Sequence, residues 1–545
     1  MMQQPYDFDF IVIGSGFGGS VSAHRLTEKG YKVGVLEMGK RYRQDDFPKT
    51  NWETKKYLWG PLLNLHGFFR MTLFRHVWVL SGVGVGGGSL VYANTLLVPP
   101  DKVWDDSRWN RLKAWRSVIP PFYETARKML GVTTNPYLGP ADKLLQMAAK
   151  DHGVGETFYP TEVGVYFGEN GKSAPDPYFD GDGPERAGCT LCGGCMVGCR
   201  YNAKNTLDKN YLFFAEKNGA KVIPETMAVD VKPLDGAADG SRGYEVETVS
   251  STRRGRGSNT LRARGIVFAG GVLGTVKLLL DAREGGSLPN LSEEVGNYVR
   301  TNSESIIGVR TPDKKIDMSD GIAIGSGIYL DENTHIEAVR YPNGSDSMAA
   351  ISTLMTHGKP GISRIFSWMG AILRSPLRSL KALNPVGWAR STIILLVMQT
   401  FDTHIRLRRK RSIFPPFRKK LQTATDGGRI PTYIPAANRF AEKMAEKING
   451  TPTTALTEIL FNVPTTAHIL GGAVMGADER DGVIDSQNRV FNYKNMYVCD
   501  GSMIGANLGV NPSLSITALS EHAMSYVKPA SEADWNETGR TAERN

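Results

Sequence analysis

The amino-terminal stretch of the chain carries the pattern that most constrains its fold. DFDFIVIGSGFGGSVSAHRLTEKGYKVGVLEMG reads as an apolar strand, a glycine turn, a helix and a second strand that ends at Glu37. Gly14, Gly16 and Gly19 give the spacing G-x-G-x-x-G, which suits a tight turn, a close approach of backbone to a pyrophosphate and close packing of helix on strand. Glu37 follows at the distance expected of an acid that accepts hydrogen bonds from a ribose. The stretch predicts a dinucleotide site, with NAD and FAD both open.

Length and composition bound the class of protein. A chain of 545 residues is too long for one hydrophobic core, so two or more domains, or one composite architecture, are expected. The net charge of +10 is partly local, because eight of the fifteen residues from Arg406 to Lys420 are Lys or Arg. A basic patch of this kind binds nucleic acid, anionic lipid or nothing. No zinc finger, RNA-recognition motif or helix-turn-helix lies beside it, so we expect no nucleic-acid partner.

The sequence also bears on location in the cell. The first ten residues lack the basic and apolar regions of a Sec signal peptide. The 25 residues from His76 to Pro100 carry no Lys, Arg, Asp or Glu, but SGVGVGGGS in their middle could not stay helical across a bilayer. Four of the five cysteines are clustered, unlike a disulfide framework spread along a secreted chain. We expect a cytoplasmic or peripheral membrane protein without a signal peptide or transmembrane helix.

Three further glycine segments recur along the chain. SGVGVGGGSLVYAN, from Ser81 to Asn94, exposes bare backbone amides that suit the edge of a flat ring. RARGIVFAGGVLGTVKLLLDA, from residue 262 to 282, is again strand, glycine turn and helix, after a predicted meander of short strands over 221–264. NMYVCDGSMIGANLGVNPSLSITALSEHAM predicts a strand up to Asp500 and a helix that opens near Pro512. Strands from both termini and the middle are expected to assemble one nucleotide fold.

With these motifs the chain resembles the glucose-methanol-choline (GMC) flavin oxidoreductases and, within them, the bacterial cholesterol oxidases. The resemblance covers most of the chain and is weakest between Gly361 and Ile459. It rests on the Gly14–Gly19 turn with Glu37, GVGGGSLV at 84–91, FAGGVLGT at 268–275, AHILGG at 467–472, DGS at 500–502 and GVNPSLSITALSE from 509. It implies FAD rather than NAD. The implied fold is α/β, with a Rossmann-like FAD-binding domain of discontinuous segments and an α+β substrate-binding domain that contains an antiparallel sheet.

The resemblance also implies domain limits and cofactor contacts. We assign 1–45, 76–110, 220–302 and 462–529 to the FAD-binding domain, 46–75, 111–219 and 303–461 to the substrate domain and its cover, and 530–545 to a disordered tail. The residues expected to contact FAD are Gly14, Gly16, Gly19, Glu37, Gly86, Gly87, Gly88, Ser89, Val229, Gly270, Asp500 and Gly501.

Three residues are candidates for the reacting centre. His468 precedes a Gly-Gly pair, Asn511 lies in the loop before the last helix, and the family places a histidine and an asparagine at these motif positions beside the flavin and the substrate hydroxyl. Removal of a hydride from an alcohol requires the hydroxyl proton to leave, with a partner for the developing alkoxide. Alternation in THIEAVRY sets Glu337 on the face opposite its two neighbours. The resemblance implies that Glu337 moves the C4 proton; an ordinary surface glutamate remains the alternative.

The implied function is FAD-dependent oxidation of a sterol 3-hydroxyl, with hydride passing to flavin N5, O2 reduced to H2O2 and a Δ5 to Δ4 isomerisation following. Two departures bear on the acceptor: Ile469 stands where the family's sterol oxidases have Pro, and Tyr92-Ala93 stand where they have Asn-Gly. A dehydrogenase for another lipophilic alcohol with a non-O2 acceptor therefore stays open. So does a weakly catalytic lipid-binding flavoprotein. The exact substrate and the oligomeric state are left open.

Two apolar segments could cover the substrate or touch a membrane. Tyr57 to Phe74 is either buried core or a lid over an apolar substrate. The segment from Gly361 to Ser391 is amphipathic and basic; we expect it to pack on a core, with transient contact to a membrane surface as the alternative. Its apolar residues at helical spacing are Ile362, Ile365, Phe366, Met369, Ile372 and Leu373, and its basic residues include Arg364, Arg374, Arg378, Lys381 and Arg390.

Four cysteines form the last motif. Cys189, Cys192, Cys195 and Cys199 have the spacing C-x2-C-x2-C-x3-C of a bacterial ferredoxin, except that Arg200 replaces Pro. One such run does not wrap one four-iron cluster comfortably, because in two-cluster ferredoxins the fourth cysteine binds the other cluster. A three-iron cluster, a remote ligand or zinc would each resolve this. The favoured interpretation is reduced thiols that fill a glycine-rich turn; an iron-sulfur cluster or zinc is the alternative.

Overall fold

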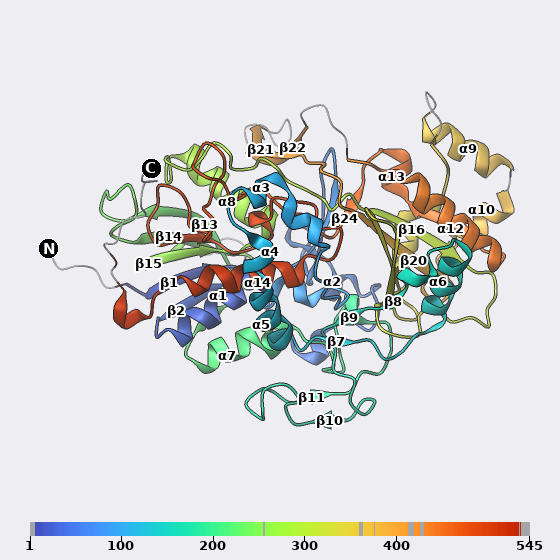
Figure 1. Cartoon of the computed structure of the whole chain (residues 1–545), viewed down its shortest axis with the longest axis horizontal. Coiled ribbons are helices and arrows are strands. Elements are labelled where there is room, and N and C mark those ends of the chain that lie inside the picture. Colours follow the sequence, from blue (N-terminus) through green and yellow to red (C-terminus); the bar gives the residue numbers. More distant parts are fainter. Residues whose placement is uncertain are drawn as a thin grey trace.

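Two seven-stranded sheets lie side by side along the long axis of the molecule (Figure 1). The structure is a computed structural model and describes residues 6–253, 257–358, 363–374, 376–411, 419–425, 430–533 and 535. One sheet is built around parallel strands and the other is antiparallel throughout. The predicted fold class, a Rossmann-like sheet beside a substrate domain with an antiparallel sheet, is confirmed.

The nucleotide sheet gathers strands from both ends and the middle of the chain. Its order is β12-β2-β1-β15-β14-β13, with β25 beside β15. The strands are β1 (Phe8–Ile13), β2 (Val33–Leu36), β12 (Lys221–Ile223), β13 (Thr226–Pro233), β14 (Tyr244–Ser250), β15 (Asn259–Phe268) and β25 (Met496–Val498). Ile11 and Val12 of β1 are both fully buried and belong to core clusters on opposite faces. An apolar run without polar alternation is what a parallel strand covered on both faces requires.

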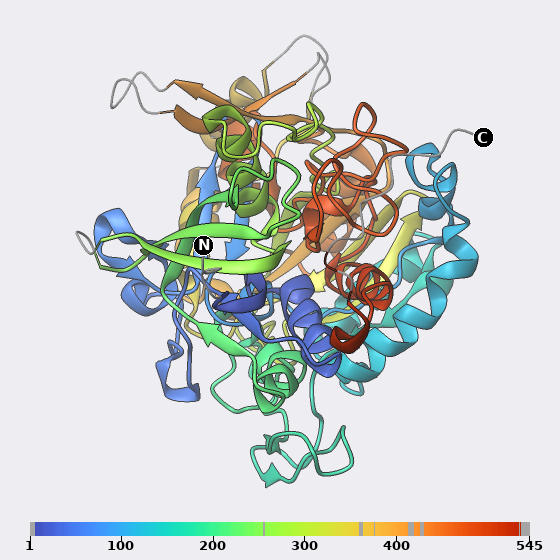
Figure 2. The same cartoon turned by 90° about the vertical axis from the view of Figure 1, so that its left-hand side faces the viewer.

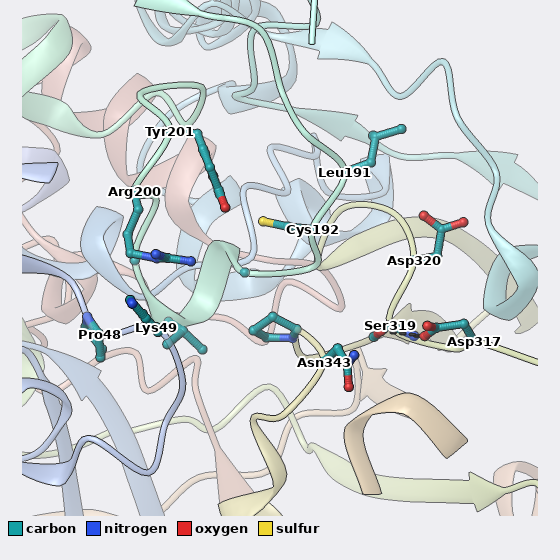
Figure 3. Close-up of a pocket in the computed structure, with 14 residues that line it drawn as sticks. Pro48, Lys49, Leu191, Cys192, Arg200, Tyr201, Asp317, Ser319, Asp320 and Asn343 are labelled. Atoms are coloured by element: carbon teal, nitrogen blue, oxygen red, sulfur yellow. Dashed lines mark hydrogen bonds between the residues drawn. The ribbon is translucent and has the colours of Figure 1, made fainter. Parts of the chain in front are cut away.

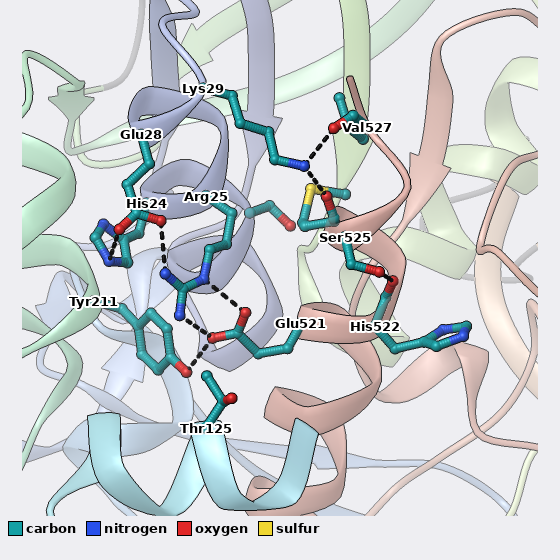
Figure 4. A network of polar contacts seen from close by, with 12 residues as sticks. His24, Arg25, Glu28, Lys29, Thr125, Tyr211, Glu521, His522, Ser525 and Val527 are labelled. Atoms are coloured by element: carbon teal, nitrogen blue, oxygen red, sulfur yellow. Dashed lines mark hydrogen bonds and ion pairs between the residues drawn. The ribbon is translucent and has the colours of Figure 1, made fainter. Parts of the chain in front are cut away.

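Helices α1 (Phe17–Glu28), α8 (Gly271–Gly285) and α14 (Ser513–Ser525) follow the glycine turns of this sheet. A polar network ties α1 to α14 (Figure 4). The Arg25 guanidinium donates to both carboxylate oxygens of Glu521, at 2.7 and 2.8 Å, and the Tyr211 hydroxyl donates to the same carboxylate at 2.6 Å. Tyr211 opens α7 (Tyr211–Lys217), so three helices that are distant in sequence share one carboxylate.

The substrate sheet has the order β19-β23-β16-β20-β18-β17-β8. Its strands are β8 (Tyr159–Pro160), β16 (Ser305–Arg310), β17 (Ile324–Asp331), β18 (Thr334–Val339), β19 (Ser352–Leu354), β20 (Thr392–Gln399) and β23 (Thr451–Ala455). Ile336 and Ala338 of β18 pack with helices α6 (Pro140–Asp151) and α12 (Pro435–Lys447). Val339 belongs instead to an aromatic cluster with Tyr57 and Phe68. The alternation predicted for this strand is confirmed.

The structure bears on three predictions: the strand meander, the start of the last helix and the conformation of residues 76–100. The meander over 221–264 is present as β12 to β15, and α14 begins directly after Pro512. Residues 76–100 contain β6 (Trp78–Gly82) and a short 3-10 turn over Gly87–Leu90. Within the residues that the structure describes, no helix is both long and apolar enough to cross a bilayer.

The two apolar segments differ from each other. Tyr57, Phe68 and Phe69 are buried, whereas Leu62 and Leu63 at the intervening turn are exposed, so the first segment is part core and part surface. In the second, α9 (Arg364–Arg374) buries none of its residues. Our expectation that this helix packs on a core holds for one side only, where Trp368 Nε1 donates to the Thr353 hydroxyl of β19 at 2.8 Å. Figure 1 shows α9 and α10 (Pro376–Leu383) at the outer end of the substrate domain. Ile362 lies outside the described residues.

The basic segment and the tail also differ from simple expectations. β21 (Arg406–Arg411) and β22 (Lys419–Ala424) form a hairpin that projects from the molecule (Figure 2). Part of its charge is neutralised by α8, because Arg409 pairs with Asp281 and Lys419 with Glu284. The tail begins ordered, since Trp535 packs against Phe10 on the nucleotide sheet. A disordered tail from residue 530 onward is therefore wrong for this first part, and residues 534 and 536–545 lie outside the described residues.

Candidate active site

The three glycines of the first motif occupy three different environments. Gly14 has a φ of +111°, and a Cβ there would lie 2.2 Å from the Ala269 carbonyl oxygen. A Cβ at Gly19 would lie 2.0 Å from the Gly14 carbonyl oxygen, so this glycine lets α1 pack on β1. At Gly16 a Cβ would meet no atom within 4 Å. That open space at the start of α1 is the cradle that a pyrophosphate needs, and the residues fit a dinucleotide.

Glu37 lies at the end of β2 and is buried. Its carboxylate accepts the Ser15 amide at 3.2 Å, the Ser15 hydroxyl at 2.5 Å, the Gly39 amide at 2.8 Å and the Gly84 amide at 3.2 Å. Burial raises the pKa of the Glu37 carboxyl, although these hydrogen bonds oppose the shift. The carboxylate thus joins the first glycine turn to the second glycine segment, and a contact to ribose remains a prediction.

The second glycine segment lies directly against the first. Gly86 and Gly87 have φ values of +103° and +51°, and a Cβ on Gly87 would lie 2.7 Å from the Gly16 Cα. The Gly86 amide donates to the Ser15 hydroxyl at 3.1 Å. Ser89 is fully buried and donates to the Gly86 carbonyl at 2.7 Å. Gly88, between them, has only the Phe17 ring near its added Cβ. This backbone can approach a cofactor closely because no side chain lies in between.

The remaining cofactor candidates come from three separate elements. Asp500 accepts the Thr275 hydroxyl at 2.5 Å, and the same hydroxyl accepts the Gly270 amide at 3.0 Å. Burial raises the pKa of Asp500. The carbonyl of Gly501 accepts the Gly471 amide at 2.9 Å. Val229 lies where the pairing of β13 with β14 is irregular. The structure brings these segments to one end of the nucleotide sheet, and their contacts with FAD remain predictions.

His468 lies just after β24 (Thr465–Thr466), and its orientation is set by a residue that the sequence did not single out. Its ring Nδ1 is hydrogen-bonded to the Glu304 carboxylate, which is fully buried. The second oxygen of Glu304 accepts the Ala467 amide at 2.9 Å, and the His468 amide donates to the Thr466 hydroxyl at 2.9 Å. With Nδ1 engaged by Glu304, Nε2 is the ring nitrogen left for a substrate hydroxyl.

Glu337 and Asn511 meet beside this pair. The Asn511 side-chain amide donates to Glu337 Oε2 at 3.1 Å. Glu337 Oε1 and Asn511 Oδ1 are buried and have no hydrogen-bond partner among the described residues. A buried oxygen without a partner is costly unless a ligand satisfies it. Glu337 is therefore no surface residue, and the structure brings it together with the two other candidates.

The electrostatics of these groups are coupled. Burial raises the pKa of Glu337 to about 7, against the hydrogen bond from Asn511 and the charge of His468, and with the repulsion of Glu304. Burial alone would lower the pKa of His468, but the Glu304 and Glu337 carboxylates outweigh it and the pKa of His468 is raised. A histidine whose pKa is raised and a carboxyl whose pKa is about 7 can move two different protons.

Asn302 is a second residue that the sequence did not reveal. Its side chain accepts the Gly509 amide at 2.8 Å and donates to the Val510 carbonyl at 2.9 Å, which fixes the loop that carries Asn511. Asn302 and Glu304 belong to the polar run RTNSES before β16. A run of that composition is typical of an exposed loop, so no local signal could have identified it as buried.

The cysteine segment is linked to the second glycine segment, because the Lys204 ammonium donates to the carbonyls of Leu90 and Cys195. Cys189, Cys195 and Cys199 are partly buried and Cys192 is exposed. Among the described residues, no three His, Cys, Asp or Glu side chains are arranged to hold a single metal ion. Outside this segment opens a cleft of about 530 Å³, between Lys49 and Arg200 on one side and acidic side chains on the other (Figure 3). Its lining does not include the residues beside His468.

Tyr92 and Ile469, which differ from the residues of the family's sterol oxidases, have defined surroundings in the structure. The Tyr92 hydroxyl donates to the Asn205 carbonyl at 2.8 Å, and its ring packs edge-on against Phe17. The Lys204 ammonium lies 4.7 Å from the centre of the same ring. Tyr92 is thus fixed between the first glycine turn and the cysteine segment, and Ile469 lies partly buried next to His468.

Comparison with known proteins places the chain among flavin oxidoreductases. Residues 399–520 match the GMC oxidoreductase family, and residues 12–42 match an NAD(P)-binding Rossmann-like domain. The chain is 56% identical over 527 residues to a cholesterol oxidase of Acinetobacter baumannii, covering 96% of this chain and 94% of that protein. It is 46% identical over 544 residues to a cholesterol oxidase of Mycobacterium tuberculosis, covering 97% of this chain and 92% of that one.

Solved structures give the same architecture. Pyridoxine 4-oxidase from Mesorbium loti superposes with a TM-score of 0.62 at 14% identity, covering 95% of this chain and 98% of that chain. At that identity the likeness bears on the fold alone, and it matches the two-sheet arrangement described above.

Proposed function

Since the chain belongs to the GMC oxidoreductase family, we propose that it oxidises the 3-hydroxyl of a sterol with FAD, reduces O2 to H2O2 and isomerises the Δ5 ketone to the Δ4 ketone. The sterol comes from the two relatives that are named cholesterol oxidases and that match nearly the whole chain. The observation that carries the proposal is the convergence of His468, Glu304, Glu337 and Asn511, drawn from four separate segments, on one buried spot.

The oxidation step depends on an oriented base. FAD, when bound, accepts the hydride from the alcohol carbon. The Glu304 carboxylate holds His468 Nδ1, so that Nε2 can accept the hydroxyl proton. Asn511 Oδ1 has no partner among the described residues and can accept a hydrogen bond at the same place. Glu304 also stabilises the imidazolium that forms when the proton arrives, just as a buried carboxylate does in other His-carboxylate pairs.

The isomerisation step depends on a carboxyl with a shifted pKa. Glu337 has a pKa of about 7 because it is buried, so near neutral pH it can both take up and return a proton. Its Oε1 has no partner within the described part of the chain, while Oε2 is held by Asn511. One oxygen is therefore fixed and the other is free to carry a proton from C4 to C6 of a ring system. This role supports a sterol rather than a simple alcohol.

The central experiment is anaerobic reduction of the bound flavin. Purified protein is mixed with cholesterol, with a long-chain primary alcohol or with buffer, and absorbance near the flavin maximum is followed in the absence of O2. We expect bleaching with the sterol and little with the primary alcohol. Bleaching by the primary alcohol alone would replace the sterol with another lipophilic substrate. A reduced flavin that is stable in air but oxidised by a dye would replace O2 as the acceptor.

A membrane-contact surface is part of the proposal, because a sterol must be taken from lipid. On α9, Phe366, Met369 and Leu373 are exposed, with 68% of Phe366 and 78% of Leu373 accessible. Arg374 is exposed beside them. Exposed apolar side chains with adjacent arginine are suited to an interface of anionic lipid.

Co-sedimentation with vesicles tests that surface. Wild-type protein should bind vesicles that contain phosphatidylglycerol more strongly than vesicles of phosphatidylcholine alone. The double variant Phe366→Ser/Leu373→Ser should lose about tenfold in binding, in proportion to the apolar area removed, and keep its turnover of detergent-dispersed sterol. Met227→Ser, at an exposed apolar position of β13 on the other sheet, serves as the control. Equal binding by all three proteins would exclude α9 as the contact.

A further inference from the structure

The four cysteines, which the proposed oxidation leaves without a role, line one pocket. Cys189, Cys192, Cys195 and Cys199 all border it, together with Lys204 and Gly321. Four thiols of one loop that face a common pocket are placed to bind one common group.

The backbone around the pocket is held from both sides. The Gly193 amide donates to the Gly321 carbonyl at 2.7 Å, and the Gly321 amide donates to the Leu191 carbonyl at 2.9 Å. Leu191 has a φ of +56°, which is unusual for a branched side chain and is maintained by these bonds. The conformation of the cysteine loop is therefore fixed by backbone hydrogen bonds.

Two of the sulfurs receive hydrogen bonds from backbone. The Leu191 amide donates to Cys189 Sγ at 3.4 Å, and the Ala323 amide donates to the Cys195 thiol. Amide donors aimed at cysteine sulfur stabilise a sulfur that carries negative charge.

Two buried basic side chains belong to the surroundings of the cysteine loop: Lys204 borders the pocket, and Arg186 interacts electrostatically with Cys199. Arg186 and Lys204 are 1% and 2% exposed. The Arg186 guanidinium donates to the Asn202 and Lys204 carbonyls and, at 2.5 Å, to the Asn205 side-chain oxygen. All these acceptors are neutral.

The Lys204 ammonium also donates only to neutral acceptors. These are the carbonyls of Leu90, Tyr92 and Cys195, at 3.0, 2.9 and 2.8 Å. Within the described residues, no carboxylate forms an ion pair with Arg186 or Lys204. Buried charges are costly unless a counter-charge lies near them. Lys204 borders the pocket together with the four cysteines, so thiolates there would supply its counter-charge.

We propose that this pocket is the site of an iron-sulfur cluster, with Cys189, Cys192, Cys195 and Cys199 as its thiolate ligands and with the Lys204 side chain beside it. The spacing C-x2-C-x2-C-x3-C is that of cluster-binding loops. A single ion is a poor fit, because no three ligand side chains among the described residues are arranged to hold one. A cluster is larger than an ion, and each cysteine binds a different iron, so its ligands stand around a pocket rather than around a point.

The location of the site suggests why a flavoprotein would keep it. Lys204 bonds to Leu90 and Tyr92 of the second glycine segment and to Cys195 of the cluster loop, so one side chain separates the two. On the opposite side, Cys192 borders both this pocket and the large outer cleft (Figure 3). The cluster would therefore lie between the predicted flavin and an open surface. The proposal does not depend on which alcohol the enzyme oxidises.

The test is analysis of protein purified without O2. Iron, acid-labile sulfide, zinc and FAD are measured per chain, and low-temperature electron paramagnetic resonance is recorded before and after reduction with dithionite. We expect about three to four iron and a similar amount of sulfide per FAD. Protein that is loaded with FAD but contains neither iron nor sulfide overturns the proposal, as does protein that contains zinc alone.

Two substitutions sharpen the result. Cys195→Ser should lose at least about two-thirds of the iron and sulfide, because one of the four proposed thiolate ligands is removed, and FAD content reports whether the variant has folded. Cys499→Ser is the matched control: it changes the fifth cysteine, which is buried beside the nucleotide sheet, and should keep both cluster and FAD. If Cys195→Ser does not fold, the iron and sulfide content of the wild-type protein decides alone. Equal iron in Cys195→Ser and Cys499→Ser would contradict the ligand assignment.

Discussion

The two sheets of this protein acquire their functional residues in different ways. In the nucleotide half, the predicted cofactor site has a short sequence motif. Three glycines within six residues form a turn, leave an open space and allow a helix to pack on a strand. In the substrate half, Glu304 directly precedes β16, Glu337 lies on β18, β20 separates these two strands, and neither residue carries a motif. A cofactor contacted by backbone needs unusual φ values, which leave glycines in the sequence. A substrate contacted by side chains needs only strand register, which leaves no such trace.

The largest effect is expected when the imidazole of His468 alone is removed. His468→Ala should lower kcat by roughly a thousandfold, because it deletes the proton acceptor, while FAD content stays unchanged. Steady-state oxidation of cholesterol and the absorbance of bound flavin report the two effects separately. Turnover that survives the substitution would show that the substrate half does not supply the base.

The second carboxylate separates two reactions in one site. Glu337→Gln should lower the rate of isomerisation by about a hundredfold, with much less effect on oxidation, so the Δ5 ketone should accumulate. In the wild type the base must be ionised, and since the pKa of Glu337 is about 7, isomerisation should decline as pH falls below that value. Chromatography of the two ketones measures both predictions. Loss of oxidation and isomerisation in equal measure would assign Glu337 to positioning instead.

The glycine motif can be tested by comparing two of its members. Gly16→Ala places a methyl group in open space at the predicted pyrophosphate cradle, so it should fold and bind FAD roughly thirtyfold more weakly. Gly19→Ala places a methyl group 2.0 Å from the Gly14 carbonyl, so it should lower the thermal stability itself. Flavin fluorescence titration and thermal melts distinguish the outcomes. Equal loss of stability in both variants would mean that Gly16 serves packing.

These differences explain how much could be read from the sequence. The fold class, the glycine turns, β18 and the start of α14 were all predictable, because periodicity and glycine spacing are local properties. Glu337 was predicted only as one of two alternatives, since alternation gives the face of a strand but not what lies above that face.

Glu304 and Asn302 could not be predicted at all. Both belong to a polar run that reads as a surface loop, but Asn302 is bonded to the loop before α14 and Glu304 to the segment after β24, and both are buried. The packing of α9 was predicted only in part. Its apolar spacing is that of a packed helix, yet nothing in a single sequence says whether the apolar face meets a core or solvent.

The smallest expected effect concerns Glu304, which acts through His468 rather than on the substrate. Glu304→Gln keeps a hydrogen-bond acceptor but removes the negative charge that raises the pKa of His468. The catalytic imidazole must be neutral to accept a proton, so its active fraction grows as pH rises through its pKa. Lowering that pKa should therefore shift the acidic limb of the kcat/KM profile to lower pH, while the maximal rate falls about tenfold because the imidazolium loses its partner.

A purely structural role would lower stability and FAD content and leave the pH profile in place. Glu304→Asp, which retains the charge on a shorter side chain, should keep the acidic limb nearer its wild-type position and serves as the matched control. If the limb moves equally in both variants, geometry rather than charge is what Glu304 contributes. If it moves in Gln alone, then a residue without any sequence signal tunes the proton acceptor, and the substrate half depends on long-range pairing where the nucleotide half depends on local turns.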